Sequence, residues 1–484
     1  MPFYKILDNS IAIDAITFTG ATSATMQVIF SQAVTTGLPI MARPGIYDVG
    51  NVSVSGQVSV YGVPGKVTFR MTALSEYILY LGAFTSAHFF GIDFDGQNAA
   101  FTTNAGLIIQ GLVNLQRASA TLISKASFER CTFKNSQLSG LSVNEVRTTV
   151  KDCIFSACQK KSIGVVSVDE LQVRGSRFED QDYAIHCSPG AASNVNIDGN
   201  IIKRCRRNGI AFEPSGTAKI NQNISVRGNK ITKLLPGDLW AVSRTDFATT
   251  GGEGNGILVY LSNNAVVSGN DVSDCQFSAI RGNVASQMTV SGNICRGSGE
   301  TALYVETVAI SVGEFGCTVS GNVVYGGGAG ISVVNFNTQG KFSTVNGNIV
   351  RDISTRDITH SGGTYKTAGT GIYVEADSNV TGNTIQNCYF GLALGTGTFT
   401  SDLVASGNVI RQTTLGIGVS GASTKEILIS GNLIAGYSSG AIKTFTYSET
   451  VPLIISGADL APANLASLVS GKVNMIGNVK RAAL

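Results

Sequence analysis

The chain has 484 residues and a formal net charge of +3; 14% of its residues are charged and 57 are glycine. Average proteins have about 25% charged residues and about 7% glycine, so this composition is typical of many tight corners between short strands. The few charges are spread along the chain without a long basic run, which excludes nucleic acid as a partner. No run of 18 apolar residues occurs, so we expect no membrane-spanning helix.

Residues 1–48 are expected to form an N-terminal cap. Four apolar residues recur there with the spacing of one helical face: Met26, Ile29, Phe30 and Ala33. Ser23 or Thr25 can cap the start of this helix, and Gly37 can end it. Short alternating strands are then predicted at 52–54, 58–60 and 67–69.

A Gly-Asn pair that follows a short apolar strand recurs along the chain at steps of 23 to 46 residues. Its glycines are Gly199, Gly228, Gly269, Gly292, Gly321, Gly347, Gly382, Gly407, Gly431 and Gly477. Looser copies lie upstream at 174–176, 151–153 and 129–131. We expect the asparagine to form the corner, because it tolerates left-handed backbone angles and can hydrogen-bond the asparagine of the next coil.

A small residue followed by an aliphatic residue comes 9 or 10 positions after most of these pairs, as in Ala279-Ile280 and Gly330-Ile331. A repeat of this length with β-branched strands indicates coils that bury their apolar face only when stacked. The Leu-x-x-Leu-x-Leu pattern of a leucine-rich repeat horseshoe is missing from the sequence, which excludes that fold. The sequence therefore predicts an all-β, single-stranded right-handed parallel β-helix of roughly fourteen coils over 49–455, with a C-terminal cap at 456–484. That cap is expected to contain a helix at 461–470 and a last strand at 473–479.

The nine cysteines include no C-x-x-C pair, which argues against a disulfide framework or a zinc site. Cys158, Cys205, Cys275 and Cys388 share one register position, so we expect them to stack as small buried side chains. Three histidines are too few to build a metal centre. We predict no metal and no cofactor.

Two coils are longer than the others, with insertions near 234–253 and 353–368. Both insertions fall in the same segment of the coil, so we expect them to project from one side of the β-helix. The first contains Trp240, and the second contains His360 and Tyr365. The coils between them would form the floor of a groove for a few sugar residues.

The strand that begins at each pair of a small and an aliphatic residue should alternate, with the aliphatic residue inside and the next residue outside. The first outward column is then His186, Ala211, Leu258, Arg281, Tyr304, Ser332, Tyr373 and Ala393. The second is Ser188, Glu213, Tyr260, Asn283, Glu306, Val334, Glu375 and Gly395. Aromatic and charged groups gather on the coils between the two insertions, which makes this solvated face the candidate site.

Two chemistries fit these residues. In a β-elimination, Arg281 would neutralise a uronate carboxylate and Tyr304 would move the proton. In an inverting hydrolysis, Glu306 and Glu375 would act as the carboxyl pair, two coil steps or roughly 9.6 Å apart. We expect the remaining site residues to bind substrate: Trp240, Tyr260, Tyr373, Asn335, Asn337, Glu300 and His186. We favour elimination; the simplest alternative is a surface ion pair between Arg281 and Glu306.

Four sequence segments between Asn194 and Ile353 resemble an uncharacterised β-helical repeat family whose members are typically exported by the twin-arginine route. They are 255–257, 277–283, 299–304 and 332–337. More loosely, the chain is similar to the right-handed parallel β-helix superfamily of pectate lyases, polygalacturonases and phage tailspikes. This resemblance implies a polysaccharide substrate and, for tailspikes, a homotrimer. The catalytic motifs of polygalacturonases, pectate lyases and alginate epimerases are missing from this sequence.

These observations together predict a depolymerase of an acidic bacterial exopolysaccharide or capsule, carried on a phage or prophage tail. No twin-arginine leader or signal peptide is visible at residues 1–5. We expect an extracellular or virion-tail location, reached either by another route, such as release of an assembled particle by lysis, or with a leader that was removed. The alternative from another class is a non-catalytic glycan-binding or structural spike.

Overall fold

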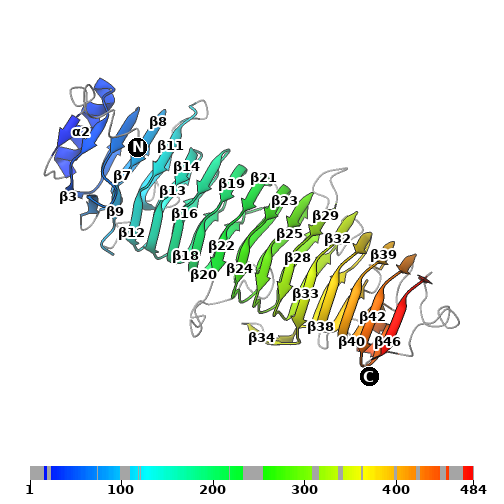
Figure 1. Ribbon diagram of the computed structural model, residues 1–484. Helices are drawn as coiled ribbons and strands as arrows, with labels where there is room; N and C mark the ends of the chain where they lie inside the picture. Colours follow the sequence, from blue (N-terminus) through cyan, green and yellow to red (C-terminus); the bar gives the residue numbers. More distant parts are fainter. Residues whose placement is uncertain are drawn as a thin grey trace. The chain divides into compact units, whose positions relative to one another are not determined.

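The computed structural model describes residues 16–18, 23–72, 75–98, 110–117, 119, 122–216, 219–232, 254–307, 316–335, 342–360, 363–396, 400–420, 426–446, 454–456 and 473–482. These residues form a parallel β-solenoid of about 13 turns with one short helix, which confirms the predicted fold class. The chain divides into two compact units, Met1–Lys219 and Ile220–Leu484, each a stack of coils (Figure 1).

The N-terminal helix α2 (Ser23–Thr36) buries the four residues that the spacing predicted, Met26, Ile29, Phe30 and Ala33. Gly37 has a φ of 71° and donates its backbone N–H to the Ala33 carbonyl at 2.8 Å, so it ends the helix as expected. The helix packs against the first coils of unit 1, where it covers the apolar interior that those coils would otherwise expose.

Unit 1 contains three stacks of parallel strands. The first is β1 (Ile16–Phe18), β2 (Ile40–Ala42), β5 (Val58–Tyr61), β8 (Ser86–Phe90), β11 (Lys125–Glu129), β14 (Arg147–Lys151), β17 (Leu171–Arg174) and β19 (Ser193–Asp198). The second is β3 (Gly45–Val49), β6 (Val67–Met71), β9 (Asp93–Asp95), β12 (Thr132–Ser136), β15 (Ile154–Cys158), β18 (Arg177–Cys187) and β20 (Ile201–Phe212). The third is β4 (Val52–Val54), β7 (Leu79–Gly82), β10 (Gly111–Gln116), β13 (Ser139–Asn144), β16 (Lys161–Val165) and the second halves of β18 and β20.

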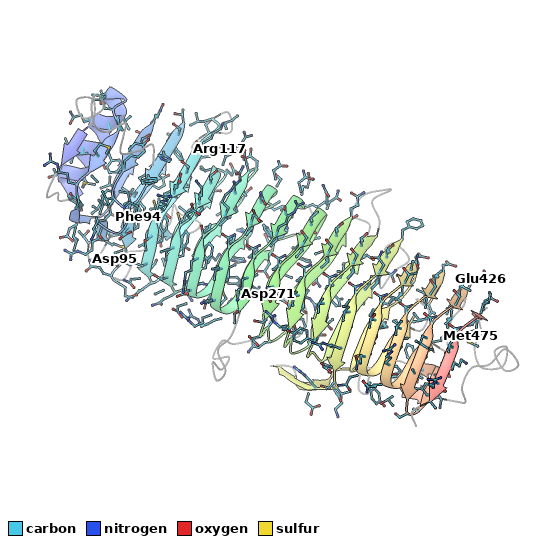
Figure 2. All side chains as sticks on the ribbon, viewed as in Figure 1. Phe94, Asp95, Arg117, Asp271, Glu426 and Met475 are labelled. Atoms are coloured by element: carbon cyan, nitrogen blue, oxygen red, sulfur yellow. The ribbon has the colours of Figure 1, made fainter. Side chains whose placement is uncertain are left out.

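The interior of unit 1 is held together by stacked phenylalanine rings. Phe94, labelled in Figure 2, stacks on Phe133 with ring centroids 4.9 Å apart. Phe133 stacks on Phe155 at 4.7 Å, and Phe155 on Phe178 at 4.9 Å. Because equivalent residues of successive coils lie one strand spacing apart, the same side chain in each coil gives a continuous apolar column.

Unit 2 also contains three stacks. The first is β21 (Asn221–Arg227), the second half of β23 (Ile257–Ser268), β26 (Met288–Ser291), β29 (Cys317–Ser320), β32 (Ser343–Asn346), β37 (Ser378–Thr381), β39 (Leu403–Ser406), β41 (Ile427–Ser430) and β45 (Val473–Ile476). The second is β22 (Lys230–Thr232), β24 (Asp271–Ser273), β27 (Ile294–Arg296), β30 (Val323–Tyr325), β33 (Ile349–Ile353), the first halves of β38 (Thr384–Leu394) and β40 (Val409–Ser420), β42 (Leu433–Tyr437) and β46 (Val479–Ala482).

The third stack of unit 2 carries the candidate site. It is made of the first half of β23, β25 (Ile280–Ser286), β28 (Thr301–Thr307), β31 (Ala329–Val334), β36 (Thr370–Val374), the second halves of β38 and β40, and β43 (Gly440–Thr446). Strand β44 (Ile454–Ser456) pairs antiparallel with β43. The helix expected at 461–470 lies outside the described residues, whereas the expected last strand at 473–479 corresponds to β45 and the start of β46.

A ladder of buried asparagines joins the coils of unit 2 at the corner between its first and second stacks. At each step the backbone N–H and the Nδ2 of one asparagine both donate to Oδ1 of the next, as from Asn293 to Asn322 at 3.0 and 2.9 Å. The Nδ2 also donates to a carbonyl of the preceding coil, as from Asn322 to Val290 at 3.0 Å. The ladder runs through Asn229, Asn270, Asn293, Asn322, Asn348, Asn383, Asn408, Asn432 and Asn478.

The predicted contact between asparagines is thus confirmed, but the predicted left-handed conformation of asparagine is wrong. The glycine before each ladder asparagine has the positive φ, such as 65° at Gly269 and 63° at Gly321. Glycine has no Cβ and adopts this conformation without steric cost, which leaves the asparagine free to point inward. In unit 1 the same corner is occupied by Ser176 and Asn200, where Ser176 N donates to Asn200 Oδ1 at 2.9 Å.

All nine cysteines are buried and free, as expected for small core residues. The column of equivalent positions that contains the four predicted cysteines, however, also contains other residue types. Cys158 is in register with Ser136, Cys205 with Gln181, and Cys388 with Ile353. The position selects for size and burial, and cysteine is one of several residues that meet this condition.

Replacing one ladder residue tests the importance of these hydrogen bonds. In Asn322→Ala, the buried amide groups of Asn293 and the Val290 carbonyl lose their partner. Each orphaned buried polar group costs about 1–3 kcal/mol, so we expect the unfolding free energy to fall by about 3 kcal/mol or more. Denaturant unfolding measures it. Asn379→Ala, at an exposed position of β37, is the matched control and should change stability little; equal effects of the two substitutions would contradict the role of the ladder.

Candidate functional site

The outward columns of the third stack in unit 2 have the predicted register. Arg281 pairs with Leu258 on one side and Tyr304 on the other, Tyr304 with Ser332, and Ser332 with Tyr373. Side chains in register on neighbouring strands lie about 4.8 Å apart, so the charged and aromatic residues of these coils come together.

Arg281 lies between two aromatic rings. Its guanidinium carbon is 3.9 Å from the ring centroid of Tyr304 and 4.7 Å from that of Phe277. Its Nη1 lies 3.7 Å from Glu300 Oε2, and no other carboxylate of the described residues is within 4.0 Å of it. The alternative of a simple ion pair with Glu306 is therefore wrong. The Nε and Nη1 atoms are buried and make no hydrogen bond within the described part of the chain.

Glu306 and Glu375 lie two coils apart on the same face. Glu306 is in register with Val334, and the next residue, Asn335, donates its backbone N–H to Glu375 Oε2 at 2.7 Å. Glu375 Oε1 also accepts the hydroxyl of Tyr373 at 3.0 Å. Glu306 Oε2 accepts Nδ2 of Asn283 at 3.2 Å. Each carboxyl group is thus oriented by at least one hydrogen bond from a neighbouring residue.

The two carboxyl groups have different electrostatic environments. Burial raises the pKa of Glu375 to about 7; its two hydrogen bonds oppose this shift, and the charge of Glu306 adds to it. Burial also raises the pKa of Glu306, but the charge of Arg281 and the Asn283 hydrogen bond counteract it. Burial thus raises both pKa values, and that of Glu375 to about 7, so that Glu375 is partly protonated near neutral pH; only Glu306 has a nearby cation, Arg281, that favours its ionised form.

The Tyr304 hydroxyl is held in its protonated form. Burial raises its pKa above the ordinary value of a tyrosine, Glu306, Glu300 and Glu375 raise it further, and Arg281 only partly offsets them. A phenol in this environment can donate a hydrogen bond but is a poor general base.

The prediction that these outward side chains are exposed to solvent is wrong for part of this cluster. Arg281 is 7% exposed and Glu375 only 1% exposed, whereas Tyr304 and Glu306 are half-buried. The reason is that large side chains on an outward column cover each other: Phe277 and Tyr304 enclose Arg281, and the Tyr373 hydroxyl contacts Glu375.

The second predicted insertion contains an antiparallel hairpin, β34 (Asp357–His360) and β35 (Gly363–Lys366). Its base is attached to the site. Arg356 donates Nη1 to the carbonyl of Ser298 at 3.1 Å, two residues before Glu300, and its backbone N–H to Thr367 Oγ1 at 2.8 Å. The side chains of His360 and Tyr365 lie outside the described residues.

The remaining predicted residues fall into three groups. Tyr260 is half-buried one strand beyond the cluster, in register with Asn283. Trp240 and Asn337, with the first insertion, lie outside the described residues. The expectation that the insertions with Trp240 and Tyr365 project from the same side stays a prediction. His186 belongs to unit 1 and is not part of the cluster in unit 2.

Sequence reasoning missed Phe277 and Asn283 as members of the site. Asn283 stands in the same outward column as Glu306, so the register contained the signal. Phe277 precedes the strand, at the corner before Ile280, and the alternation rule does not apply there.

The fold is that of a parallel β-solenoid. Residues 91–246 match the family described as a right-handed beta helix region, and residues 235–452 match the family described as the periplasmic copper-binding protein NosD. No curated protein gives a significant sequence match.

Several solved structures are similar at low identity. The Dettilon tailspike protein shares 12% identity over 89% of this chain and 68% of its own, with a TM-score of 0.30. PfbA, a surface adhesin of Streptococcus pneumoniae, shares 13% over 90% and 96%, with a TM-score of 0.37. The catalytic unit of a GH87 alpha-1,3-glucanase from Streptomyces thermodiastaticus shares 11% over 97% and 68%, with a TM-score of 0.32. The likeness is limited to general architecture.

The described residues do not fit the copper site that the second family description implies. They contain no group of three or more His, Cys, Asp or Glu that could hold a metal ion. The thiolate is the form of cysteine that binds metal, and burial raises the pKa of Cys158, Cys317 and Cys388 to about 12. In the same part of the chain, no helix has the length and apolar character needed to cross a membrane.

The raised pKa of Glu375 predicts a pH-dependent stability. The folded state holds this proton up to about pH 7, whereas an unfolded glutamate releases it near 4.5. The folded state therefore binds more protons between these values, so the unfolding free energy should fall as pH rises from about 4.5 to about 7, by about 3 kcal/mol. Denaturant unfolding across this range measures it. Glu375→Gln should flatten the decline and Asp357→Asn, on the exposed hairpin, should not; an unchanged slope in Glu375→Gln would contradict the assignment.

Proposed function

We propose that the third stack of unit 2 carries a glycan-hydrolysing site in which Glu375 is the general acid and Glu306 the general base. The observation that supports this most directly is the pair of carboxyl groups on one face, two coils apart, in unequal surroundings: burial raises the pKa of Glu375 to about 7, whereas the charge of Arg281 counteracts the rise at Glu306. Two carboxyls with divided roles are what glycoside hydrolysis requires.

In this mechanism Glu375 gives its proton to the oxygen of the leaving sugar, and Glu306 takes a proton from the attacking water. Two coil steps are about 9.6 Å along the stack, which is near the upper limit of the ~6.5–9.5 Å separation of inverting enzymes. The water would fit between the two groups, and the anomeric configuration would be inverted.

Arg281 supports an acidic substrate. It is a permanent cation on the same face as the two carboxyl groups; its Nε and Nη1 make no hydrogen bond with the described residues, and Nη1 has an ion-pair contact with Glu300 at 3.7 Å. A guanidinium binds a carboxylate through two parallel hydrogen bonds, and the enclosing rings of Phe277 and Tyr304 fix its plane. A uronate-containing polysaccharide matches these groups.

We prefer hydrolysis to β-elimination as the reaction of this site because a suitable base for elimination is missing from the predicted residues. Elimination needs a base that removes the proton beside the uronate carboxylate, and Tyr304, the residue expected for this role, is kept protonated by burial and by three carboxylates. Its hydroxyl is better suited to bind the substrate.

One observation favours a second candidate function, a non-catalytic glycan-binding or structural protein. Glu375 and Arg281 are almost fully buried, and buried polar networks also serve to fix a unique fold. In that case the cluster would stabilise the coils, and sugars would bind only at the exposed edges of the stack.

We infer a location outside the cytoplasm, extracellular or periplasmic, because the family that matches residues 235–452 is described as periplasmic. A place on a phage tail and a homotrimeric assembly are finer parts of the proposal. The mass in solution, measured by light scattering, tests the trimer against a monomer of 50.4 kDa.

Activity on a panel of acidic bacterial exopolysaccharides tests the proposal. General acid-base catalysis contributes about 10²–10⁴-fold, so Glu306→Gln and Glu375→Gln should each lower kcat by at least about 100-fold. Tyr304→Phe should still cleave the substrate but bind it more weakly, and Asp357→Asn, on the exposed hairpin, should retain full activity. New reducing ends without absorbance in the near ultraviolet indicate hydrolysis. Products that absorb there would instead indicate β-elimination and contradict the proposed mechanism. Binding without any cleavage across the panel would support the second candidate.

Arg281→Met tests the charge of the substrate. The substitution should weaken the binding of a uronate-containing oligosaccharide by about 10-fold or more, as expected for loss of a charge-assisted contact, and leave a neutral oligosaccharide unaffected. Arg351→Met is the matched control, because Arg351 also lies over a tyrosine ring, that of Tyr325 at 5.1 Å, but on the second stack. Calorimetry measures both; equal losses for the acidic and neutral ligands would contradict the assignment.

A further inference from the structure

A second cluster of titratable side chains lies in unit 1, on the adjacent strands β16, β18 and β20 (Figure 1). It consists of Lys161, Tyr183, His186 and Arg207 on these strands and of Glu213, which directly follows β20. Lys161 is in register with Tyr183, and His186 with Gly164 on one side and Ala211 on the other. The topology thus places all five residues on neighbouring coils, at the outer face of the third stack.

His186 is the centre of this cluster. Its ring stacks on that of Tyr183 with centroids 4.1 Å apart and planes within 9°. Its Nε2 lies 2.9 Å from Glu213 Oε2, and burial lowers its pKa, so the imidazole is neutral at pH 7. Its Nδ1 is buried and makes no hydrogen bond within the described residues.

The cluster has an excess of positive charge. Among its five residues Lys161 and Arg207 are cations and Glu213 is the carboxylate; the charge of Glu213 raises the pKa of Lys161, and that of Arg207 lowers it. The Lys161 ammonium makes no hydrogen bond or ion pair with any described residue, and burial lowers its pKa although Glu213 partly offsets the shift. A half-buried cation without a partner is costly, and an anion placed beside it would remove that cost.

We propose that Lys161, Arg207, His186 and Glu213 form a binding site for an acidic saccharide, separate from the carboxyl pair of unit 2. The sugar carboxylate would bind between the Lys161 ammonium and the Arg207 guanidinium, and the sugar hydroxyls would bind to Glu213 and to Nδ1 of His186. Such a combination of cations, one carboxylate and a neutral imidazole recognises a charged group and its neighbouring hydroxyls at once. The site needs no catalysis, so it holds whether or not unit 2 is an enzyme.

Calorimetric titration of the full chain with a uronate tetrasaccharide tests this proposal. The measurement uses the Arg281→Met, Glu306→Gln background, in which the proposed site of unit 2 is disabled and no cleavage can interfere. Lys161→Met and Arg207→Gln should each weaken binding at least 10-fold. Lys203→Met, which removes a cation elsewhere on β20, is the matched control and should leave the affinity unchanged. A neutral tetrasaccharide of equal length should not bind at this site.

Thermal unfolding separates a binding role from a structural one. Because Lys161 is partly buried without a partner, Lys161→Met should unfold at the same or a higher temperature than the parent, while its affinity falls. The proposal is overturned if the parent does not bind the acidic tetrasaccharide, if Lys161→Met binds it as well as Lys203→Met does, or if inorganic phosphate or sulfate competes at equal concentration, since the site would then recognise any oxyanion.

Discussion

The structure depends on satisfying the buried backbone groups at each corner of the coil. A chain that turns inside an apolar stack brings amide and carbonyl groups into an interior without water, where each unpaired group is costly. In unit 2 the side chain of one asparagine per coil solves this problem: it accepts two hydrogen bonds from one neighbouring coil and donates to both neighbours. The preceding glycine supplies the conformation that the turn requires. Regular corners keep the strands in register, and the register aligns the residues of both candidate sites.

The same register explains how charges accumulate on the outer face. Each position of a coil forms a column, so that a single arginine or glutamate meets the residues one and two coils away. Arg281 is enclosed by rings from its own coil and the next, and Glu375 receives hydrogen bonds from Asn335 and Tyr373. These contacts shift the protonation of each group through burial first and through charge second. The chemistry of the site therefore arises between coils and is not contained in any single repeat.

Much of this could be predicted from the sequence because a solenoid is governed by local spacing. The apolar face of α2, the Gly-Asn corners and the columns through Arg281, Tyr304, Ser332 and Tyr373 follow from periodicity alone. The conformation of the Gly-Asn pair could not be assigned correctly, since both residue types tolerate positive φ and only the buried hydrogen bonds decide between them. The burial of Arg281 and Glu375 also escaped prediction. Alternation tells which face a side chain occupies, but the size and direction of side chains on neighbouring coils determine whether that face contacts water.

The separation of Glu306 and Glu375 has a consequence for how such a protein can diversify. Both residues occupy equivalent positions of their coils, Glu306 on β28 and Glu375 directly after β36. The spacing of their backbones along the stack is therefore a whole number of strand spacings and cannot be tuned continuously by loop adjustments. Inserting or deleting one complete coil, with its own Gly-Asn corner, would preserve the ladder and lengthen or shorten that distance by about 4.8 Å. Selection acting on a scaffold of this kind would change the accepted linkage in discrete steps, so that related proteins would differ by gain or loss of entire repeats rather than by gradual drift of the site.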